Sequence, residues 1–92
     1  MTILNNAITL SNVTATSIIV PDNQRQIVHL HNMTKSSNEN IYIGSADVTL
    51  TNSIHLDPGA SIKIEVPAGD TLWALSDPNG LVVGVLQVQN QD

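Results

Sequence analysis

Short runs of β-branched and apolar residues, separated by polar turns, make up most of this chain. The clearest alternation lies in Ile62-Lys63-Ile64-Glu65-Val66, which predicts a strand with its isoleucines and valine in the core and its charged residues in solvent. Proline and glycine mark the turns, as in Asp57-Pro58-Gly59 and Asp77-Pro78-Asn79-Gly80; the second suits a short hairpin connection. The whole pattern predicts strands at Asn12–Val20, Arg25–Met33, Asn40–Gly44, Val48–Leu50, Ser53–Leu56, Ala60–Val66, Thr71–Ser76 and Leu81–Val88.

Two of these predicted strands carry bulky residues on both sides. Leu81–Val88 is almost entirely apolar, which predicts a strand covered on both faces. The strand Arg25–Met33 is expected to be central in a sheet or to lie against a neighbouring subunit. One of its faces holds Val28 and Leu30, and the other holds Ile27, His29, His31 and Met33.

The first eleven residues precede the regularly spaced strands and turns. We expect Met1–Ser11 to form an arm or edge strand, and residues 12–92 to form the domain. Such an arm adds a strand to its own domain or reaches onto a neighbour, since an exposed apolar strand invites aggregation. Its candidate partner contacts are Ile3, Leu4, Ile8 and Leu10.

Composition supports the strand pattern. The chain has 92 residues, of which 10 are Ile, 9 Val and 8 Thr, while good helix formers are scarce. We therefore predict an all-β fold: one small antiparallel β-sandwich or β-barrel of about 7–8 short strands. A domain of this size buries only about 60–65% of its unfolded surface, so association with other chains is a natural source of further stability.

The charge balance excludes several partners. The formal net charge is −5, and Arg25, Lys35 and Lys63 are the only Lys or Arg residues. Three scattered cations cannot neutralise a run of phosphates, so neither nucleic acid nor an anionic membrane surface is expected as a partner. There is no apolar run long enough to span a membrane and no signal-peptide pattern. With no cysteine, the chain forms neither disulfides nor thiolate metal sites.

Three histidines are the candidates for metal binding. His29 and His31 are two residues apart, which on a strand places both rings on one face about 7 Å apart. His55 could supply a third ligand. In the alternative reading the histidines are polar residues on a solvent-facing or subunit-facing surface, and this reading is preferred because neither His29 nor His31 has an acidic neighbour in sequence to orient it. We therefore expect no metal and no cofactor.

Catalytic arrangements are absent from the sequence pattern. No serine lies in a Gly-x-Ser-x-Gly elbow, and the aspartates fall in turns, where they commonly bond the backbone. We therefore expect no enzymatic activity. The two aromatic residues, Tyr42 and Trp73, are candidate partner contacts; Trp73 is expected to pack in the core or against a partner, and Tyr42 to point outward.

Three segments together resemble small virion proteins of tailed bacteriophages. They are Ile41-Tyr42-Ile43-Gly44-Ser45-Ala46-Asp47-Val48-Thr49, then Asn52-Ser53-Ile54-His55-Leu56-Asp57-Pro58-Gly59-Ala60-Ser61, then Pro67-Ala68-Gly69-Asp70-Thr71-Leu72-Trp73-Ala74. The resemblance covers roughly Asn12 to Val88. Ser53 and Trp73 depart from it, since the family pattern has glycine and tyrosine there, and the Met1–Ser11 arm is not part of it.

This resemblance implies a capsid decoration (cement) protein that binds the major capsid protein and stabilises the shell. It also implies a homo-oligomer, with a trimer favoured over a dimer, that is made in the host cytoplasm and located on the virion. The alternative is a tail-tip or fibre-tip adhesion module that binds a host surface glycan or protein. In that case Tyr42 and the polar loop Thr34–Asn40 are the expected ligand contacts.

Overall fold

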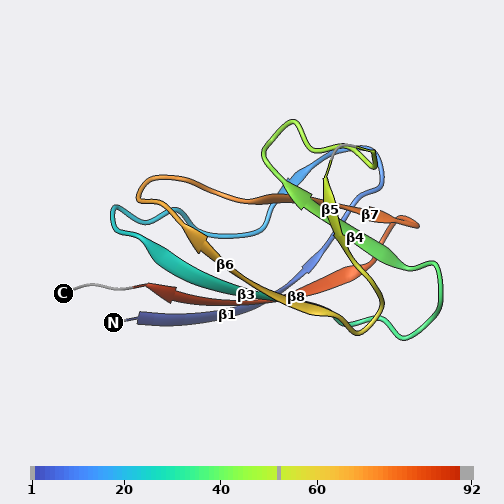
Figure 1. Cartoon of the computed structure of the whole chain (residues 1–92), viewed down its shortest axis with the longest axis horizontal. Helices are drawn as coiled ribbons and strands as arrows, with labels where there is room; N and C mark the ends of the chain where they lie inside the picture. The colour runs from blue at the N-terminus through green and yellow to red at the C-terminus, as the bar shows by residue number, and fades with distance from the viewer. Residues whose placement is uncertain (1, 52, 90–92) are drawn as a thin grey trace.

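Two four-stranded antiparallel sheets pack face to face in the computed structural model, which describes residues 2–51 and 53–89 (Figure 1). The predicted all-β fold is confirmed, and of the two predicted alternatives, sandwich or barrel, it is the sandwich. Sequence predictions for Met1, Asn52 and residues 90–92 lie outside the described residues. The strands are β1 (Thr2–Thr9), β2 (Thr16–Ser17), β3 (Gln26–Asn32), β4 (Asn40–Gly44), β5 (Ile54–Leu56), β6 (Ser61–Val66), β7 (Trp73–Asp77) and β8 (Val82–Gln89).

The strand order shows that the chain crosses between the sheets at almost every connection. One sheet has the order β1-β8-β3-β6 and the other β2-β7-β4-β5. Among the strands of the described residues, only β4 and β5 are both consecutive in sequence and hydrogen-bonded neighbours. The predicted hairpin at Asp77–Gly80 is therefore wrong, because β7 and β8 belong to different sheets. Gly80 still has the positive φ, 91°, that its turn requires.

The core lies between the two sheets and follows the predicted faces. Val28 and Leu30 of β3 are fully buried, and β6 places Val66 in the core with its charged residues exposed. Ile62 and Ile64 pack against this core from the same face of β6. The buried cluster consists of Leu10, Ile18, Ile19, Val28, Leu30, Ile41, Ile43, Leu56, Val66, Ala74, Leu81, Val83 and Val85.

The predicted strand Asn12–Val20 is mostly irregular. The hydroxyl oxygen of Ser11 accepts hydrogen bonds from the backbone N–H groups of Val13 (3.1 Å) and Thr14 (3.2 Å), and this local turn competes with strand pairing. Only Thr16–Ser17 forms a strand. The apolar residues that suggested a longer strand, Ile18 and Ile19, are nevertheless buried in the core.

The predicted strand Val48–Leu50 is also wrong. The N–H of Val48 donates to the carbonyl of Ser45 (3.0 Å) in a turn, and the Val48 side chain folds back over β4. It occupies the space beside Gly44, where a β-carbon would lie 3.2 Å from Val48 Cγ2. A glycine at position 44 thus makes room for the valine, which is why an apolar residue here does not mark a strand.

The prediction that the last strand is covered on both faces is wrong as well. Val83 and Val85 of β8 point into the core, whereas Val82, Leu86 and Val88 lie on a face that no other part of the described chain covers fully. β3 lies between β8 and β6, so it is an interior strand of its sheet, which was the first of the two alternatives.

The Met1–Ser11 segment contributes β1, an edge strand that pairs along its whole length with β8 of the same chain. The pairing runs from Thr2 opposite Gln89 to Thr9 opposite Val82. Leu10, directly after the strand, is only 2% exposed and belongs to the core. The first and last strands therefore lie side by side (Figure 1).

Two buried glutamines, Gln26 and Gln87, form hydrogen bonds that hold the backbone of Val20, in the irregular segment before β3, against the sheet. Gln87 Nε2 donates to Gln26 Oε1 (2.8 Å), and both side-chain amides donate to the carbonyl of Val20. The N–H of Val20 in turn donates to Gln87 Oε1 (3.2 Å). Because every member has a partner, this polar cluster is compatible with its burial.

Candidate contact face

The side of the β1-β8-β3-β6 sheet that is turned away from the core is the candidate functional surface, called the outer face below. Strand register fixes which residues share it, because residues directly opposite one another in an antiparallel pair point to the same side. Its two central rows are Asn5-Leu86-His29-Lys63 and Ala7-Gly84-His31-Ser61, read from β1 to β6.

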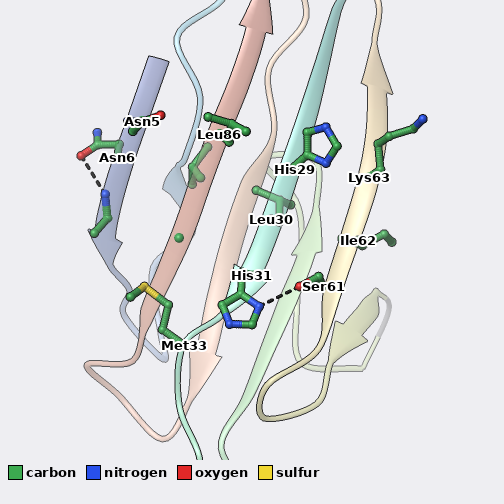
Figure 2. A pocket seen from close by; sticks show the side chains of 13 residues that line it. Asn5, Asn6, His29, Leu30, His31, Met33, Ser61, Ile62, Lys63 and Leu86 are labelled. Carbon is green, nitrogen blue, oxygen red and sulfur yellow. Dashed lines mark hydrogen bonds between the residues drawn. The ribbon is translucent and has the colours of Figure 1, made fainter. Parts of the chain in front are cut away.

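A hollow of about 800 Å³, open to solvent, lies in the middle of the outer face (Figure 2). Its floor is low because Gly84 has no side chain and its neighbour on β1 is the small Ala7. Met33 lies beside this floor, with its Sδ 3.2 Å from the point where a β-carbon of residue 84 would be. An alanine at position 84 would therefore press against Met33, and a large side chain there would occupy part of the hollow.

Large apolar side chains surround the hollow and remain exposed. Met33 is 52% exposed and Leu86 37%, and Ile3 near the end of β1 is 60% exposed. Single exposed apolar residues are ordinary, but several on one sheet face are typical of a surface that contacts another molecule. The outer face thus gathers three exposed large apolar side chains, while Val13, Val20, Leu50 and Ile54 are exposed elsewhere on the domain.

The polar groups of the hollow are neutral or cationic. His31 Nδ1 and Ser61 Oγ are 2.7 Å apart in a hydrogen bond, and His29 and Lys63 lie in the next row. None of the residues that line the hollow is acidic, although the chain carries eight Asp or Glu residues. The hollow therefore presents neutral hydrogen-bonding groups and the cation of Lys63 beside apolar side chains, on a protein that is acidic as a whole.

The three histidines do not come together. His29 and His31 share the exposed face of β3 as predicted, but His55 lies on β5 in the other sheet. There its Nε2 is 3.1 Å from Asp57 Oδ1, and its ring centroid is 5.8 Å from that of Tyr42. Across residues 2–51 and 53–89, no group of three or more His, Cys, Asp or Glu side chains could hold a metal ion.

No protein-family model matches this chain, and no curated protein matches it. Among solved structures, it is similar to a subunit of the Bacillus endospore appendages, which form a novel family of disulfide-linked pili. The match has a TM-score of 0.53 at 17% identity, and it covers 98% of this chain and 90% of the pilus subunit. At this identity the likeness shows a shared fold. The present chain has no cysteine with which to form such disulfides.

The predicted contact residues fall in different environments. Ile3 lies on the outer face, while Leu4 and Ile8 are half-buried and alternate with it along β1. Tyr42 and Trp73 are half-buried on the opposite sheet, so they are remote in the fold from the hollow. No helix of the described residues is long and apolar enough to cross a membrane.

Sequence reasoning placed His29, His31 and Met33 on this face, but it did not single out Gly84 and Leu86, which shape the hollow. The alternation of valine, glycine, leucine and valine at positions 82 to 88 contained the signal. A glycine inside a strand often marks a place where another group approaches the backbone closely.

Proposed function

We propose that this chain is a non-catalytic structural subunit of a phage particle, a capsid decoration protein that docks through its outer face. The observation that carries the proposal is the hollow over Gly84, which is apolar, open and free of acidic lining residues. The resemblance of the Ile41–Ala74 region to phage virion proteins supplies the assignment to a particle.

The physical basis of docking is burial of the apolar part of this face. Covering apolar surface contributes about 25 cal/mol per Å² before the costs of association. Leu86 and Met33 supply this area, and they flank a hollow into which a partner side chain can insert. His29 and Lys63 at the rim favour a partner surface that offers carbonyl or carboxylate oxygens.

A matched pair of leucine substitutions tests the docking face. Leu86 and Leu50 are both 37% exposed, but Leu86 lines the hollow and Leu50 lies in the loop before β5. We expect Leu86→Asp to weaken binding to phage heads by at least about tenfold, because it places a charge in the apolar contact. Leu50→Asp should bind as the original chain does. Co-sedimentation of purified protein with heads measures both.

The comparison is meaningful if both variants keep the circular dichroism spectrum and melting temperature of the original protein within a few degrees. Equal binding by Leu86→Asp and Leu50→Asp would contradict docking through the outer face. The same binding assay with the parent chain alone tests whether heads are the partner at all.

A fibre or tail-tip module is the second candidate function, and the fold shared with a pilus subunit favours it. The copy number of the chain in purified particles separates the two, measured by quantitative mass spectrometry. A number comparable with that of the major capsid protein supports decoration, and a handful of copies supports a tail or fibre location. Absence of the chain from particles would contradict both.

A further inference from the structure

The free edge of β1 differs from the other sheet edges of this protein. β2 and β5, the edges of the second sheet, have only two and three residues. β6 carries Lys63 and Glu65 and is followed by Pro67, and these are features that discourage pairing with another strand. β1 has eight residues and contains neither a charged residue nor a proline. Among the sheet edges of the described residues, β1 is thus the long one that has neither charged residues nor a proline to discourage pairing with another strand.

The direction of the backbone groups on β1 follows from one hydrogen bond. The N–H of Leu10 donates to the carbonyl of Leu81 (2.8 Å), continuing the ladder with β8. Because N–H and C=O groups alternate along an antiparallel strand, the groups of the odd-numbered residues point away from β8. Those residues are Ile3, Asn5, Ala7 and Thr9.

One of these outward groups is satisfied within the chain by a neighbouring side chain. The N–H of Ala7 donates to Asn6 Oδ1 (2.9 Å), at an exposed position. Within the described residues, the outward backbone groups of Ile3 and Asn5 have no backbone partner, since β1 pairs only with β8. The edge is therefore open and ready to accept a strand.

We propose that β1 pairs antiparallel with β1 of a second copy of this chain, about a two-fold axis at Asn6. Opposed residues of an antiparallel pair point to the same side of the sheet, so inner residues must lie opposite inner residues. With a two-fold axis perpendicular to the sheet, this requires one residue of β1 to lie directly opposite its own copy. Centred on Asn6, it places Leu4 opposite Ile8 and Asn5 opposite Ala7 of the second copy. The two four-stranded sheets then become one sheet of eight strands.

The chemistry of β1 favours its own copy as the occupant. Leu4 and Ile8 are both apolar and half-buried, so their contact extends the inner side of each sheet. Asn6 meets Asn6, and two primary amides can bond each other. The N–H of Ala7 exchanges its bond to Asn6 Oδ1 for the carbonyl of Asn5 of the second copy, within a ladder of about eight backbone bonds.

The charge distribution agrees with this pairing. Each copy carries a formal net charge of −5, which opposes close approach of two copies in general. Because β1 contains no charged residue, the pairing brings no two like charges directly opposite one another across the contact. The inference rests on the geometry of β1 alone and holds whether or not the outer face docks on a capsid.

Two substitutions at Asn5 test the strand pairing. Asn5→Pro removes an outward N–H and leaves the ladder with β8 intact, whereas Asn5→Ala keeps that N–H. Sedimentation equilibrium at protein concentrations up to about 1 mM should show a dimer for the original chain and for Asn5→Ala. For Asn5→Pro we expect the dissociation constant of the dimer to be at least about tenfold larger, with an unchanged circular dichroism spectrum.

Single cysteines test the register, since the chain has no cysteine of its own. Opposed residues at a pair that is not hydrogen-bonded have Cα atoms about 4.5 Å apart, which a disulfide can bridge. Asn6→Cys should therefore form a covalent dimer under mild oxidation. Asn5→Cys is the control. Residue 5 lies opposite residue 7 of the second copy, so the two cysteines at position 5 are diagonal neighbours about 7–8 Å apart and should form a disulfide much more slowly.

Several results would overturn the proposal: a monomer at every concentration, a dimer that Asn5→Pro leaves unchanged, or covalent linkage that is no faster for Asn6→Cys than for Asn5→Cys. Growth into open-ended polymers would overturn it as well, because a two-fold contact closes on itself. Leu86→Asp should dimerise like the original chain, so loss of docking and loss of dimerisation can be told apart.

Discussion

Replacing Ile41 with alanine is expected to lower the free energy of unfolding by about 2–5 kcal/mol, the usual range for truncating a buried isoleucine. Ile41 is 0% exposed and lies in the core on β4, so its removal leaves a cavity between the sheets. In a domain whose total stability is about 5–15 kcal/mol, this is a large fraction.

Ile54→Ala is the matched control for this prediction. Ile54 lies on β5, which pairs with β4, and is 56% exposed, so its truncation should change the free energy of unfolding by no more than about 0.5 kcal/mol. Urea unfolding followed by the fluorescence of Trp73 measures both variants. Similar effects for the two isoleucines would contradict the sandwich core described above.

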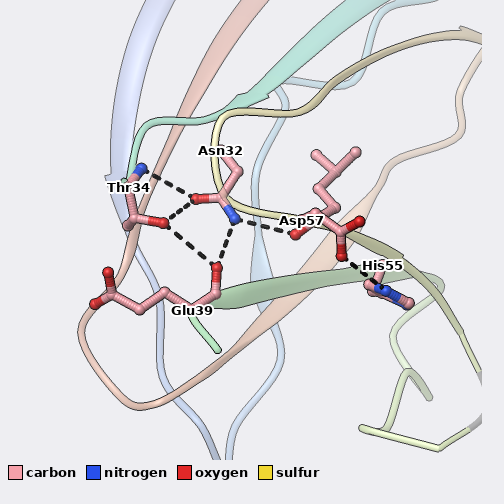
Figure 3. A network of polar contacts seen from close by, with 6 residues as sticks. Asn32, Thr34, Glu39, His55 and Asp57 are labelled. Atoms are coloured by element: carbon pink, nitrogen blue, oxygen red, sulfur yellow. Dashed lines mark hydrogen bonds and ion pairs between the residues drawn. The ribbon is translucent and has the colours of Figure 1, made fainter. Parts of the chain in front are cut away.

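Replacing Asn32 with alanine is expected to lower the free energy of unfolding by about 3 kcal/mol, even though the residue is polar. Asn32 is 0% exposed, and its Nδ2 donates to the carbonyls of Glu39 (2.8 Å) and Leu56 (3.0 Å), as Figure 3 shows. Its Oδ1 accepts bonds from the N–H (3.2 Å) and the hydroxyl (2.8 Å) of Thr34. Alanine would remove these four bonds. The carbonyl of Glu39 would still accept from the Thr34 hydroxyl (3.3 Å), but the buried carbonyl of Leu56 would lose its Asn32 donor, and a buried polar group that loses its partner costs about 1–3 kcal/mol.

The position of Asn32 explains why the effect reaches beyond one contact. It joins the end of β3 to the loop before β4 and to the end of β5, and thereby links the two sheets. Urea unfolding is again the measurement, at concentrations low enough to keep the chain monomeric. Asn5→Ala is the control, because Asn5 is exposed on the edge strand. A cost for Asn32→Ala as small as for Asn5→Ala would show that the network contributes little.

Local pattern predicted the strands that alternate regularly and the turns that contain glycine after proline. In β6 the alternation identified the buried face correctly, because Lys63 and Glu65 cannot be buried without partners. Gly59 has the positive φ, 77°, that the Asp57-Pro58-Gly59 sequence predicts, and the N–H of Ala60 closes this turn on the carbonyl of Asp57 (2.9 Å).

The same reasoning failed where side-chain packing in a turn, or a contact between separate segments, decides the conformation. Val48 looks like a strand residue, but Gly44 offers it a place against β4, and a turn forms instead. Asn32 looks like a surface residue, but the carbonyls of Glu39 and Leu56 converge on it and allow its burial. Neither outcome is visible in the residues adjacent to Val48 or Asn32.

The sequence by itself determined the all-β class, most strand positions and, in regularly alternating strands such as β6, the face that is buried, because alternation and turn chemistry are properties of neighbouring residues. The tertiary structure decided which strands pair. It placed β1 at a free edge beside β8 and left Leu86, Met33 and Gly84 on an uncovered face. These features depend on contacts between residues far apart in the chain, whose free energies no local pattern records.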